Sequence, residues 1–345
     1  MIYEKRLDAL RIAMGERGLD ALLLTPSTDL FYLTGVRGHL YERLSCCLVT
    51  MDGAHFVSPG FELGNLKEES RRLLSCHGWD DGQSPFALLE GLLPAGERRM
   101  AVGTAVPSWV LLGVQALRQG YQYCSAEELL REQRMVKDER EYDLLRSVQL
   151  RSGHALQRLI EHGLCGLTEL QAAKLLMLYS DEEGIDSPDG APIVAAGPNG
   201  ALPHHQSDDT PICPGDAVVI DFGGADRESG YIADTTRTFA IKRAPEGFEA
   251  VYAVVREANE AAFRAAAPGV LCCDVDRAAR DVIAKAGYGE YFTHRLGHGL
   301  GLDVHEHPYM SRDNRRAVAV GNVFSDEPGI YLPGRFGVRI EDQLF

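Results

Sequence analysis

The segment Gly297-His298-Gly299-Leu300-Gly301 constrains this chain more than any other part of its sequence. Glycine has no Cβ atom, so three glycines at alternate positions allow another backbone to approach closely and leave the imidazole of His298 accessible. A single histidine in such a loop usually has an ordinary structural role. The significance of His298 therefore depends on the acidic residues found elsewhere in the chain.

Four carboxylates accompany His298, each at the end of a short strand-like or glycine-rich segment: Asp221, Asp234, Glu327 and Glu341. The two aspartates lie in apolar strands around a turn, and an antiparallel hairpin can bring such carboxylates side by side. A charge in an apolar strand needs a partner or a metal, although a single aspartate is more often a turn former. One imidazole and four carboxylates are enough to hold two divalent ions. Because paired ions generate hydroxide at neutral pH, we expect a hydrolase.

The bulk composition predicts a globular protein without nucleic-acid or membrane partners. The 345 residues are 45% hydrophobic and 25% charged, which allows a sizeable core. A net charge of -15 argues against nucleic acid, because phosphate binding needs surplus lysine and arginine. The sequence contains no run of 18 apolar residues, so no membrane span is expected. Residues 1–6 lack a signal-peptide pattern. The eight cysteines show no C-x-x-C spacing and are expected to be reduced thiols in a cytoplasmic protein.

Residues 1–126 are predicted to form an N-terminal α/β domain, because helical and strand-like patterns alternate there. Residues 3–18 have helical periodicity, and residues 21–24 form a short apolar strand. Two strands are expected around the turn Asp52-Gly53. A helix that starts with proline covers residues 107–119.

Residues 127–345 are predicted to form the second domain, which contains all of the candidate site residues. It starts with a charged helical stretch over residues 127–161, interpreted as the connector and the first long helix of this domain, and a capping box at Thr168 opens the next helix. The later elements are expected at residues 217–220 and 232–241 for strands, and about 246–266 and 274–286 for helices.

Further side chains near the carboxylates suit peptide or amide hydrolysis. Oxygen-rich ligands with a single imidazole favour Mn, Co, Fe or Zn. The reaction also needs hydrogen-bond donors for an oxyanion and a proton shuttle, and imidazoles suit both tasks. The candidates are His204, His205, His294 and His305, each of which could instead be a loop histidine. Arg339 and Glu341 alternate in one strand and share a face, which is also compatible with a surface salt bridge.

Taken together, these motifs resemble the creatinase and methionine-aminopeptidase superfamily, whose members have the "pita-bread" fold. The chain is most similar to Xaa-Pro aminopeptidases and Xaa-Pro dipeptidases (prolidases), and the resemblance covers nearly its whole length. The specific motifs extend from Ala201-Leu202-Pro203-His204 to Arg339-Ile340-Glu341-Asp342, whereas Phe31-Tyr32-Leu33-Thr34-Gly35 resembles the creatinase-like domain more loosely. The resemblance implies an α/β (α+β) chain with a small creatinase-like domain at residues 1–126 and a pita-bread catalytic domain at 127–345.

The resemblance also implies a role for each site residue. Two divalent ions, Mn first with Co, Zn or Fe as alternatives, would be held by Asp221, Asp234, His298, Glu327 and Glu341. Asp234 and Glu341 would bridge both ions, and Arg339 would steady the bridging carboxylates. Glu327 would also act as the proton shuttle. The substrate-side histidines would be His204, His294 and His305.

Two features depart from the family pattern. The hairpin at residues 225–230 is two residues longer than usual, which affects its turn and not the ligands. Prolidases typically carry a basic residue directly after the His-Glu-x-Pro segment, where it holds the carboxylate of the dipeptide. Here His305-Glu306-His307-Pro308 is followed by Tyr309, which favours an aminopeptidase that tolerates longer peptides. Arg312 is near enough in sequence to keep the dipeptidase alternative open.

The expected function is therefore hydrolysis of the Xaa-Pro bond at the N-terminus of a proline-containing peptide, with an Xaa-Pro dipeptidase as the alternative. A metal-free amidinohydrolase of the creatinase type is disfavoured, because those enzymes lack the ligand set. A non-catalytic protein-binding module on the same fold would usually have lost ligands. By analogy a homodimer is expected, in which His39 and Tyr41 of the segment Phe31–Tyr41 reach the partner, although an ordinary surface loop fits that segment equally well.

Overall fold

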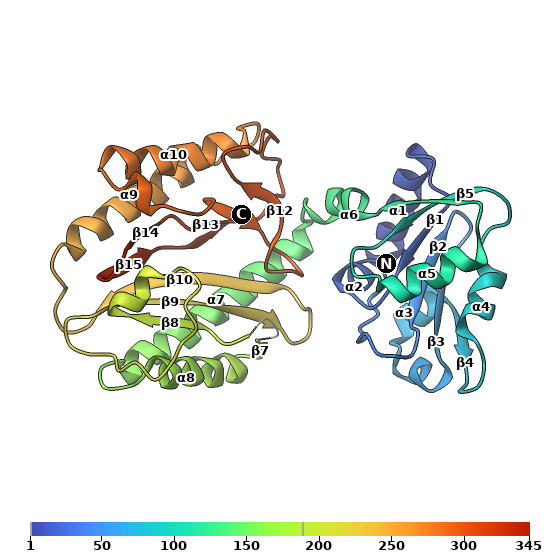
Figure 1. The fold of residues 1–345 in the computed structure, drawn as a ribbon, viewed down its shortest axis with the longest axis horizontal. Helices are drawn as coiled ribbons and strands as arrows, with labels where there is room; N and C mark the ends of the chain where they lie inside the picture. The colour runs from blue at the N-terminus through green and yellow to red at the C-terminus, as the bar shows by residue number, and fades with distance from the viewer. Residues whose placement is uncertain (1, 188–189) are drawn as a thin grey trace. The chain divides into compact units, whose positions relative to one another are not determined.

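The computed structural model describes residues 2–187 and 190–345, which belong to two compact units, Met1–Arg134 and Met135–Phe345. Both units mix helices and strands, as the sequence predicts (Figure 1). The boundary expected after residue 126 falls before helix α6 (Glu127–Arg134), which packs against α1 (Ile2–Glu16) of the first unit. In the described ranges, no helix is long and apolar enough to cross a membrane.

The first unit contains a six-stranded sheet in the order β4-β3-β2-β1-β5-β6. Its antiparallel centre, β1 to β3, is flanked by strands that pair in parallel. The strands are β1 (Ala21–Leu24), β2 (Cys46–Thr50), β3 (Ala54–Pro59), β4 (Ser75–Trp79), β5 (Arg98–Val102) and β6 (Tyr121–Ser125). The remaining helices are α2 (Thr28–Thr34), η1 (Gly60–Asn65), α3 (Glu68–Leu73), α4 (Pro85–Leu92) and α5 (Ser108–Leu117).

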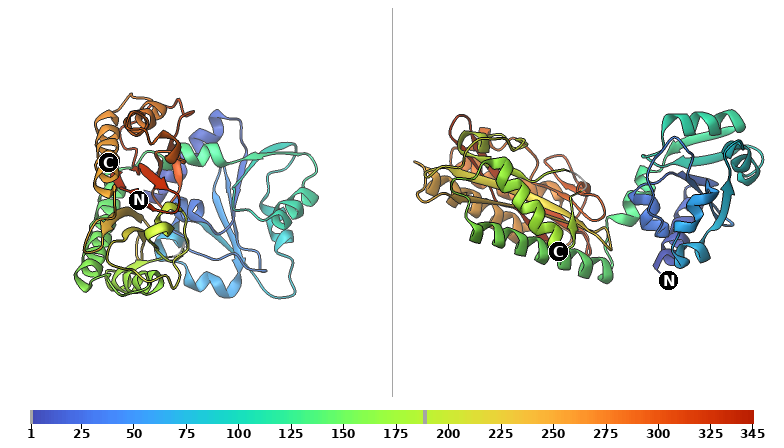
Figure 2. Two further views of the ribbon diagram at one scale, coloured as in Figure 1. Left: turned by 60° about the vertical axis from the view of Figure 1, so that its left-hand side comes forward. Right: turned by 90° about the horizontal axis from the view of Figure 1, so that it is seen from below.

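The second unit places its strands between two pairs of helices (Figures 1 and 2). One pair is α7 (Glu139–His162) and α8 (Glu169–Glu182), and the other is α9 (Phe248–Ala265) and α10 (Cys272–Lys285). The strands near the first pair are β7 (Ile185–Asp186), β8 (Ile193–Ala196), β9 (Ala217–Asp226) and β10 (Ile232–Ala240). The others are β11 (Gly297–Gly299), β12 (Glu306–Met310), β13 (Phe324–Asp326), β14 (Gly329–Leu332), β15 (Phe336–Arg339) and β16 (Asp342–Leu344), with short helices η2 (Gly197–Ala201) and η3 (Gly289–Tyr291).

Each pair of helices in the second unit has its own hydrophobic core. Leucines and alanines of α7 and α8 pack with buried side chains of β8 and β9, such as Val194 and Ile220. Apolar residues of α9 and α10 pack with strands from the C-terminal part of the chain, such as β14 and β15. The candidate site lies where the strands of these two cores meet.

The charged helical stretch expected over residues 127–161 consists of the short helix α6 and the long helix α7. The break falls at Met135–Asp138, where Asp138 adopts an extended conformation and caps α7. Its carboxylate accepts a hydrogen bond from the Glu141 backbone, while the Glu141 side chain accepts one from the Asp138 N–H. This capping box supplies partners for N–H groups that would otherwise be unpaired at the helix start, so the chain begins a new helix there. All eight cysteines are free thiols, as expected.

Candidate active site and metal centre

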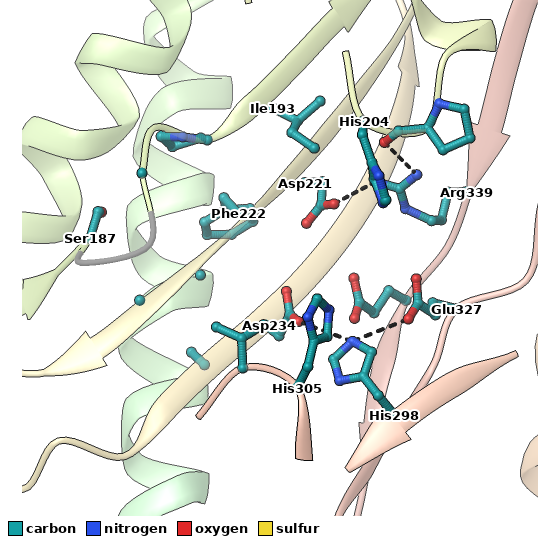
Figure 3. A pocket seen from close by; sticks show the side chains of 18 of the residues that line it. Ser187, Ile193, His204, Asp221, Phe222, Asp234, His298, His305, Glu327 and Arg339 are labelled. Carbon is teal, nitrogen blue, oxygen red and sulfur yellow. Dashed lines mark hydrogen bonds and ion pairs between the residues drawn. The ribbon is translucent and has the colours of Figure 1, made fainter. Parts of the chain in front are cut away.

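A pocket of about 600 Å³ in the second unit is lined by every residue to which the family resemblance assigned a role (Figure 3). These are His204, Asp221, Asp234, His294, His298, His305, Glu327, Arg339 and Glu341. They come from strands and loops that are up to 137 residues apart in sequence, the separation between His204 and Glu341. The fold therefore brings the whole predicted set to one place.

The β9–β10 hairpin positions the two aspartates. Its register pairs Asp234 with Gly223 and Asp221 with Thr236, so the carboxylates occupy diagonal positions on one face. A Cβ atom on Gly223 would lie 1.9 Å from the Ala233 carbonyl oxygen, so only glycine allows the two strands to approach this closely. Asp234 is 8% exposed, and a carboxylate that is so well buried needs a compensating partner.

His298 projects from β11 toward these carboxylates. Its Nε2 atom lies 3.2 Å from Glu327 Oε1 and 3.6 Å from Asp234 Oδ2. Its Nδ1 lies 3.1 Å from the Gly299 carbonyl oxygen, to which it donates a hydrogen bond. Without a metal, burial is outweighed by the neighbouring carboxylates, which raise the pKa of His298, so the charged ring donates from Nε2 to Glu327. In the neutral ring the same Nδ1 bond would leave the lone pair on Nε2, which is the arrangement commonly found for metal-bound histidine.

The donor atoms around His298 fit a divalent cation. Asp234, His298 and Glu341 each offer one ligand atom, and these atoms lie within 4.8 Å of one another. Glu341 Oε2 accepts a hydrogen bond from Thr236, but its buried Oε1 has no hydrogen-bond partner in the structure. An unpaired carboxylate oxygen beside other carboxylates is destabilising unless a positive charge is present. Mixed carboxylate and imidazole donors are those that Mn, Co, Fe and Zn accept.

The pKa shifts at the site express the same crowding of negative charge. Burial and the charge of Asp221 raise the pKa of Asp234 well above its usual range. Burial and the charge of Asp234 do the same to Glu341. Burial also acts to raise the pKa of Glu327, but the hydrogen bond and charge of His298 outweigh it and lower that pKa to about 2. The carboxyls of Asp234 and Glu341 resist ionisation, whereas that of Glu327 favours it. This pattern indicates that the pocket contains more negative charge than its own cationic side chains neutralise.

Asp221 and Arg339 form an ion pair on one wall of the pocket. Arg339 Nη2 donates to Asp221 Oδ2 at 2.5 Å, and Nε donates to the Thr236 hydroxyl at 3.1 Å. Arg339 is 3% exposed, so it is not part of a surface salt bridge with Glu341. Its guanidinium instead fixes the orientation of the Asp221 carboxylate.

Tyr331 on β14 connects Arg339 with His294, a role that no local sequence pattern indicates. Its hydroxyl accepts a hydrogen bond from Arg339 Nη1 at 2.9 Å and lies 2.8 Å from His294 Nε2. His294 Nδ1 donates to the Arg295 carbonyl at 2.7 Å, so Nε2 of the neutral ring accepts from Tyr331. Burial lowers the pKa of His294 and raises that of Tyr331 to about 12, which keeps both groups neutral. In sequence, a tyrosine between isoleucine and leucine looks only like a core residue.

His305 and His204 are exposed residues of the pocket lining (Figure 3). The His305 ring packs edge-on against His298 with centroids 4.3 Å apart. Burial and the neighbouring His298 lower the pKa of His305 to about 4, so its imidazole is neutral near pH 7. The next residue, Glu306, pairs with the buried Lys137 at 2.5 Å and anchors the segment that carries His305.

Glu169, at the start of α8, anchors the loop that carries His204. It is fully buried, and its carboxylate accepts hydrogen bonds from His205 Nε2 at 2.7 Å and Asn199 Nδ2 at 3.0 Å. The N–H groups of Ala196 and Asp208 donate to the same carboxylate at 2.7 and 3.2 Å. His205, which follows His204 in sequence, therefore faces Glu169 and not the pocket. Local sequence predicted Glu169 only as part of a helix start, because these partners are brought together by tertiary structure.

Glu169→Gln should lower the free energy of unfolding by about 1–3 kcal/mol, because one amide oxygen cannot satisfy donors that approach both carboxylate oxygens. Urea denaturation measures the change. The matched control is Glu182→Gln on the same helix, where the carboxylate pairs with Arg158 at the surface and the expected loss is below about 1 kcal/mol. Equal losses in the two variants would contradict an anchoring role for Glu169.

Comparison with known families gives two matches that together cover most of the chain. The family model described as "Metallopeptidase family M24" matches residues 143–345. The model described as "Creatinase/Prolidase N-terminal domain" matches residues 6–136. The first match contains every residue of the pocket described above.

Individual relatives match over nearly the full length. "Probable dipeptidase PepE" of Mycobacterium tuberculosis is 39% identical over 344 residues, which cover 99% of this chain and 91% of the relative. A Xaa-Pro dipeptidase of Pyrococcus horikoshii is 30% identical, with coverage of 96% and 91%. The crystal structure of a dipeptidase from Pyrococcus horikoshii OT3 superposes with a TM-score of 0.91 at 37% identity, covering 98% of this chain and 94% of that one.

Solved structures of this family include both kinds of proline peptidase. An X-Pro aminopeptidase from Thermotoga maritima MSB8 superposes with a TM-score of 0.83 at 29% identity, covering 95% of this chain and 93% of that one. The fold class expected from the sequence, a creatinase-like domain followed by a pita-bread domain, is thus confirmed. The chain is an enzyme that belongs to metallopeptidase family M24, with a creatinase/prolidase domain at its N-terminus.

Proposed function

We propose that this metallopeptidase is a Xaa-Pro dipeptidase that works with two divalent metal ions. The observation that carries the proposal is the convergence of His298 and four carboxylates in a single pocket. Relatives named dipeptidase or Xaa-Pro dipeptidase, which match this chain over nearly its whole length, support the choice of substrate. The sequence favoured an aminopeptidase because Tyr309 occupies the position of a basic residue, but these relatives fit the dipeptidase alternative better.

The proposed metal ligands are Asp221, Asp234, His298, Glu327 and Glu341. The unpaired Glu341 Oε1 and the raised pKa values of Asp234 and Glu341 support this assignment, since both features call for added positive charge. The bound ions would supply Lewis-acid activation of water and of the scissile carbonyl. A donor set dominated by oxygen favours Mn, with Co, Zn or Fe as alternatives.

Glu327 is the proposed proton carrier of the reaction. Its lowered pKa leaves it ionised, so it can accept a proton from the attacking water and deliver it to the proline nitrogen of the leaving group. The neutral imidazole of His305 lines the pocket beside His298, where its N–H can donate to the oxyanion. His204 is placed to contact the peptide from the opposite loop. Arg339 binds Asp221 and so holds this proposed ligand in position. His294 supports Arg339 through the hydroxyl group of Tyr331.

An apolar part of the pocket suits the proline ring of the substrate. Pro192, Ile193, Phe222 and Val304 contribute to its lining beside the charged residues. The bond into proline has no N–H group and a fixed φ angle, so general peptidases that bind the N–H cannot use it well. Shape complementarity to a rigid ring would therefore select Xaa-Pro bonds.

The wild-type enzyme, after Mn addition, should hydrolyse Ala-Pro at least about tenfold faster than Ala-Ala or Ala-Pro-Ala, as judged by kcat/KM. Chelation should abolish the activity, and added Mn should restore it. Equal cleavage of Ala-Ala would contradict proline selectivity, and a preference for Ala-Pro-Ala would restore the aminopeptidase alternative. Metal analysis that found fewer than about one ion per chain would instead favour a non-catalytic binding module.

A further inference from the structure

Arg295, which the sequence analysis did not single out, lies at the pocket with the histidines that face the substrate. It precedes β11 and lines the pocket together with His204 and His305. The positive charge of Arg295 contributes to the lowered pKa of His305, which places the two side chains near each other. Arg295 is half-buried, so its guanidinium remains accessible from solvent.

The guanidinium of Arg295 is held over an aromatic ring. Its Cζ lies 4.2 Å from the centroid of Tyr309, on β12. The β11–β12 register places Tyr309 directly opposite His298, the histidine at the centre of the carboxylate cluster. Stacking on an aromatic face fixes the plane of a guanidinium while leaving its N–H groups free to donate. Tyr309, which occupies the position of the expected basic residue, therefore orients the guanidinium of Arg295 beside it.

Arg295 is the available cation of this pocket. Of the two arginines that line it within residues 2–187 and 190–345, Arg339 is occupied by Asp221, Thr236 and Tyr331. Arg295 makes no ion pair and no side-chain hydrogen bond to any residue in those ranges. Arg312, the other sequence candidate, is exposed and lines only a neighbouring cavity, whereas Arg295 lines both that cavity and this pocket. A half-buried guanidinium without an acidic partner is suited to bind an anion from solution.

We propose that Arg295 binds the α-carboxylate of the dipeptide and so makes the enzyme select dipeptides over longer peptides. The inference rests on the proposed Xaa-Pro function and adds the residue that limits substrate length. A dipeptide carries its carboxylate on the residue that follows the scissile bond, and a planar guanidinium binds a carboxylate through two parallel N–H donors. A tripeptide has a neutral amide at that position, which cannot make the same charge-assisted pair. Tyr309 and Arg295 together thus replace the single basic residue expected after Pro308.

The test compares Arg295→Gln, Arg295→Lys and the control Arg312→Gln in the Mn-reconstituted full chain. The substrates are Ala-Pro and Ala-Pro-amide, which differ only in the charge of the C-terminal group. The wild type should prefer the acid, and Arg295→Gln should raise KM for Ala-Pro by roughly 10- to 100-fold with kcat within about threefold. The same variant should leave hydrolysis of the amide within about threefold. Arg295→Lys should recover part of the loss, because it restores the charge without the planar fork.

Several outcomes would overturn the inference. Equal losses on the acid and the amide would assign Arg295 a purely structural role. An unchanged KM for Ala-Pro in Arg295→Gln, or a loss in Arg312→Gln that equals it, would place the carboxylate elsewhere. If the wild type cleaves no Xaa-Pro substrate, the proposed function fails and this inference fails with it, whereas a wild type that cleaves acid and amide equally well overturns this inference alone.

Discussion

Asp234→Asn should abolish peptide hydrolysis and at the same time stabilise the metal-free protein. Asp234 is the aspartate nearest His298 and belongs to the cluster of ligand atoms that lie within 4.8 Å of one another. An amide is a poor ligand for a divalent ion, so kcat/KM should fall by at least about 1,000-fold; changes to the partners of metal ligands alone typically cost roughly 10- to 100-fold. Activity on Ala-Pro after Mn addition measures this effect.

The stability effect has the opposite sign because the pKa of Asp234 is raised in the folded state. Between the ordinary carboxyl pKa of 3.8 and the raised value, the folded protein binds more protons than the unfolded chain, so stability falls as pH rises. At neutral pH the asparagine removes this cost, and the free energy of unfolding of the metal-free protein should rise.

The control for both measurements is Asp313→Asn, which replaces an exposed aspartate outside the pocket. It should change neither turnover nor stability beyond about 0.5 kcal/mol. Unchanged turnover in Asp234→Asn would exclude its role as a metal ligand. A large loss of metal-free stability would show that Asp234 contributes more through its contact with His298 than it costs through burial.

Gly297→Ala should be the most destabilising single methyl addition at the site. A Cβ atom at this position would lie 1.8 Å from the Ser325 carbonyl oxygen, a distance that no side-chain rotation can relieve. The strands β11 and β13 would have to separate, and His298 would move with its strand. Because the clash is with backbone, we expect a loss of about 3 kcal/mol or more in the free energy of unfolding, at the upper end of overpacking effects. Chemical denaturation measures the change.

Gly153→Ala provides the matched control, since it adds the same methyl group to another glycine. Gly153 is exposed in α7, and an added Cβ atom would meet no other atom within 4 Å. In a helix interior this substitution should stabilise the protein by about 0.5–1 kcal/mol. If Gly297→Ala were as stable as Gly153→Ala, close approach of β11 and β13 could not explain the glycines around His298.

Most elements of the second unit were predictable because their signals are local. The apolar strands around residues 227–230 predicted the β9–β10 hairpin that holds Asp221 and Asp234. The Thr168 capping box predicted the start of α8. The position of the break before α7 was not predicted, because the charged residues on either side share one helical period, and the Asp138 cap that divides them fits equally well inside a charged helix.

The site was predictable only in part, for a physical reason. Carboxylates and histidines in apolar or glycine-rich segments stand out in sequence, and all of the candidates except His205 line the pocket, although their roles as ligands and catalysts remain predictions. Tyr331, Glu169 and Arg295 did not stand out, because their partners lie on other strands or loops that only the folded structure brings beside them. The family pattern places the basic residue directly after Pro308, on β12. In this chain the stacked pair of Arg295 and Tyr309 involves two segments, since Arg295 precedes β11 and Tyr309 lies on β12.

The separation of the second unit into two hydrophobic cores gives the proposed ions a mechanical role. Asp221 and Asp234 belong to the sheet backed by α7 and α8, whereas His298 comes from strands backed by α9 and α10. An ion shared between them would join the two halves at the point where their carboxylates repel one another, and would add to the Arg339–Asp221 and Thr236–Glu341 contacts that already connect them. Ligand binding of this kind stabilises the folded state by mass action, so the lifetime of the protein would follow the supply of the ion. A cell short of the metal would lose the protein itself, and not merely its turnover.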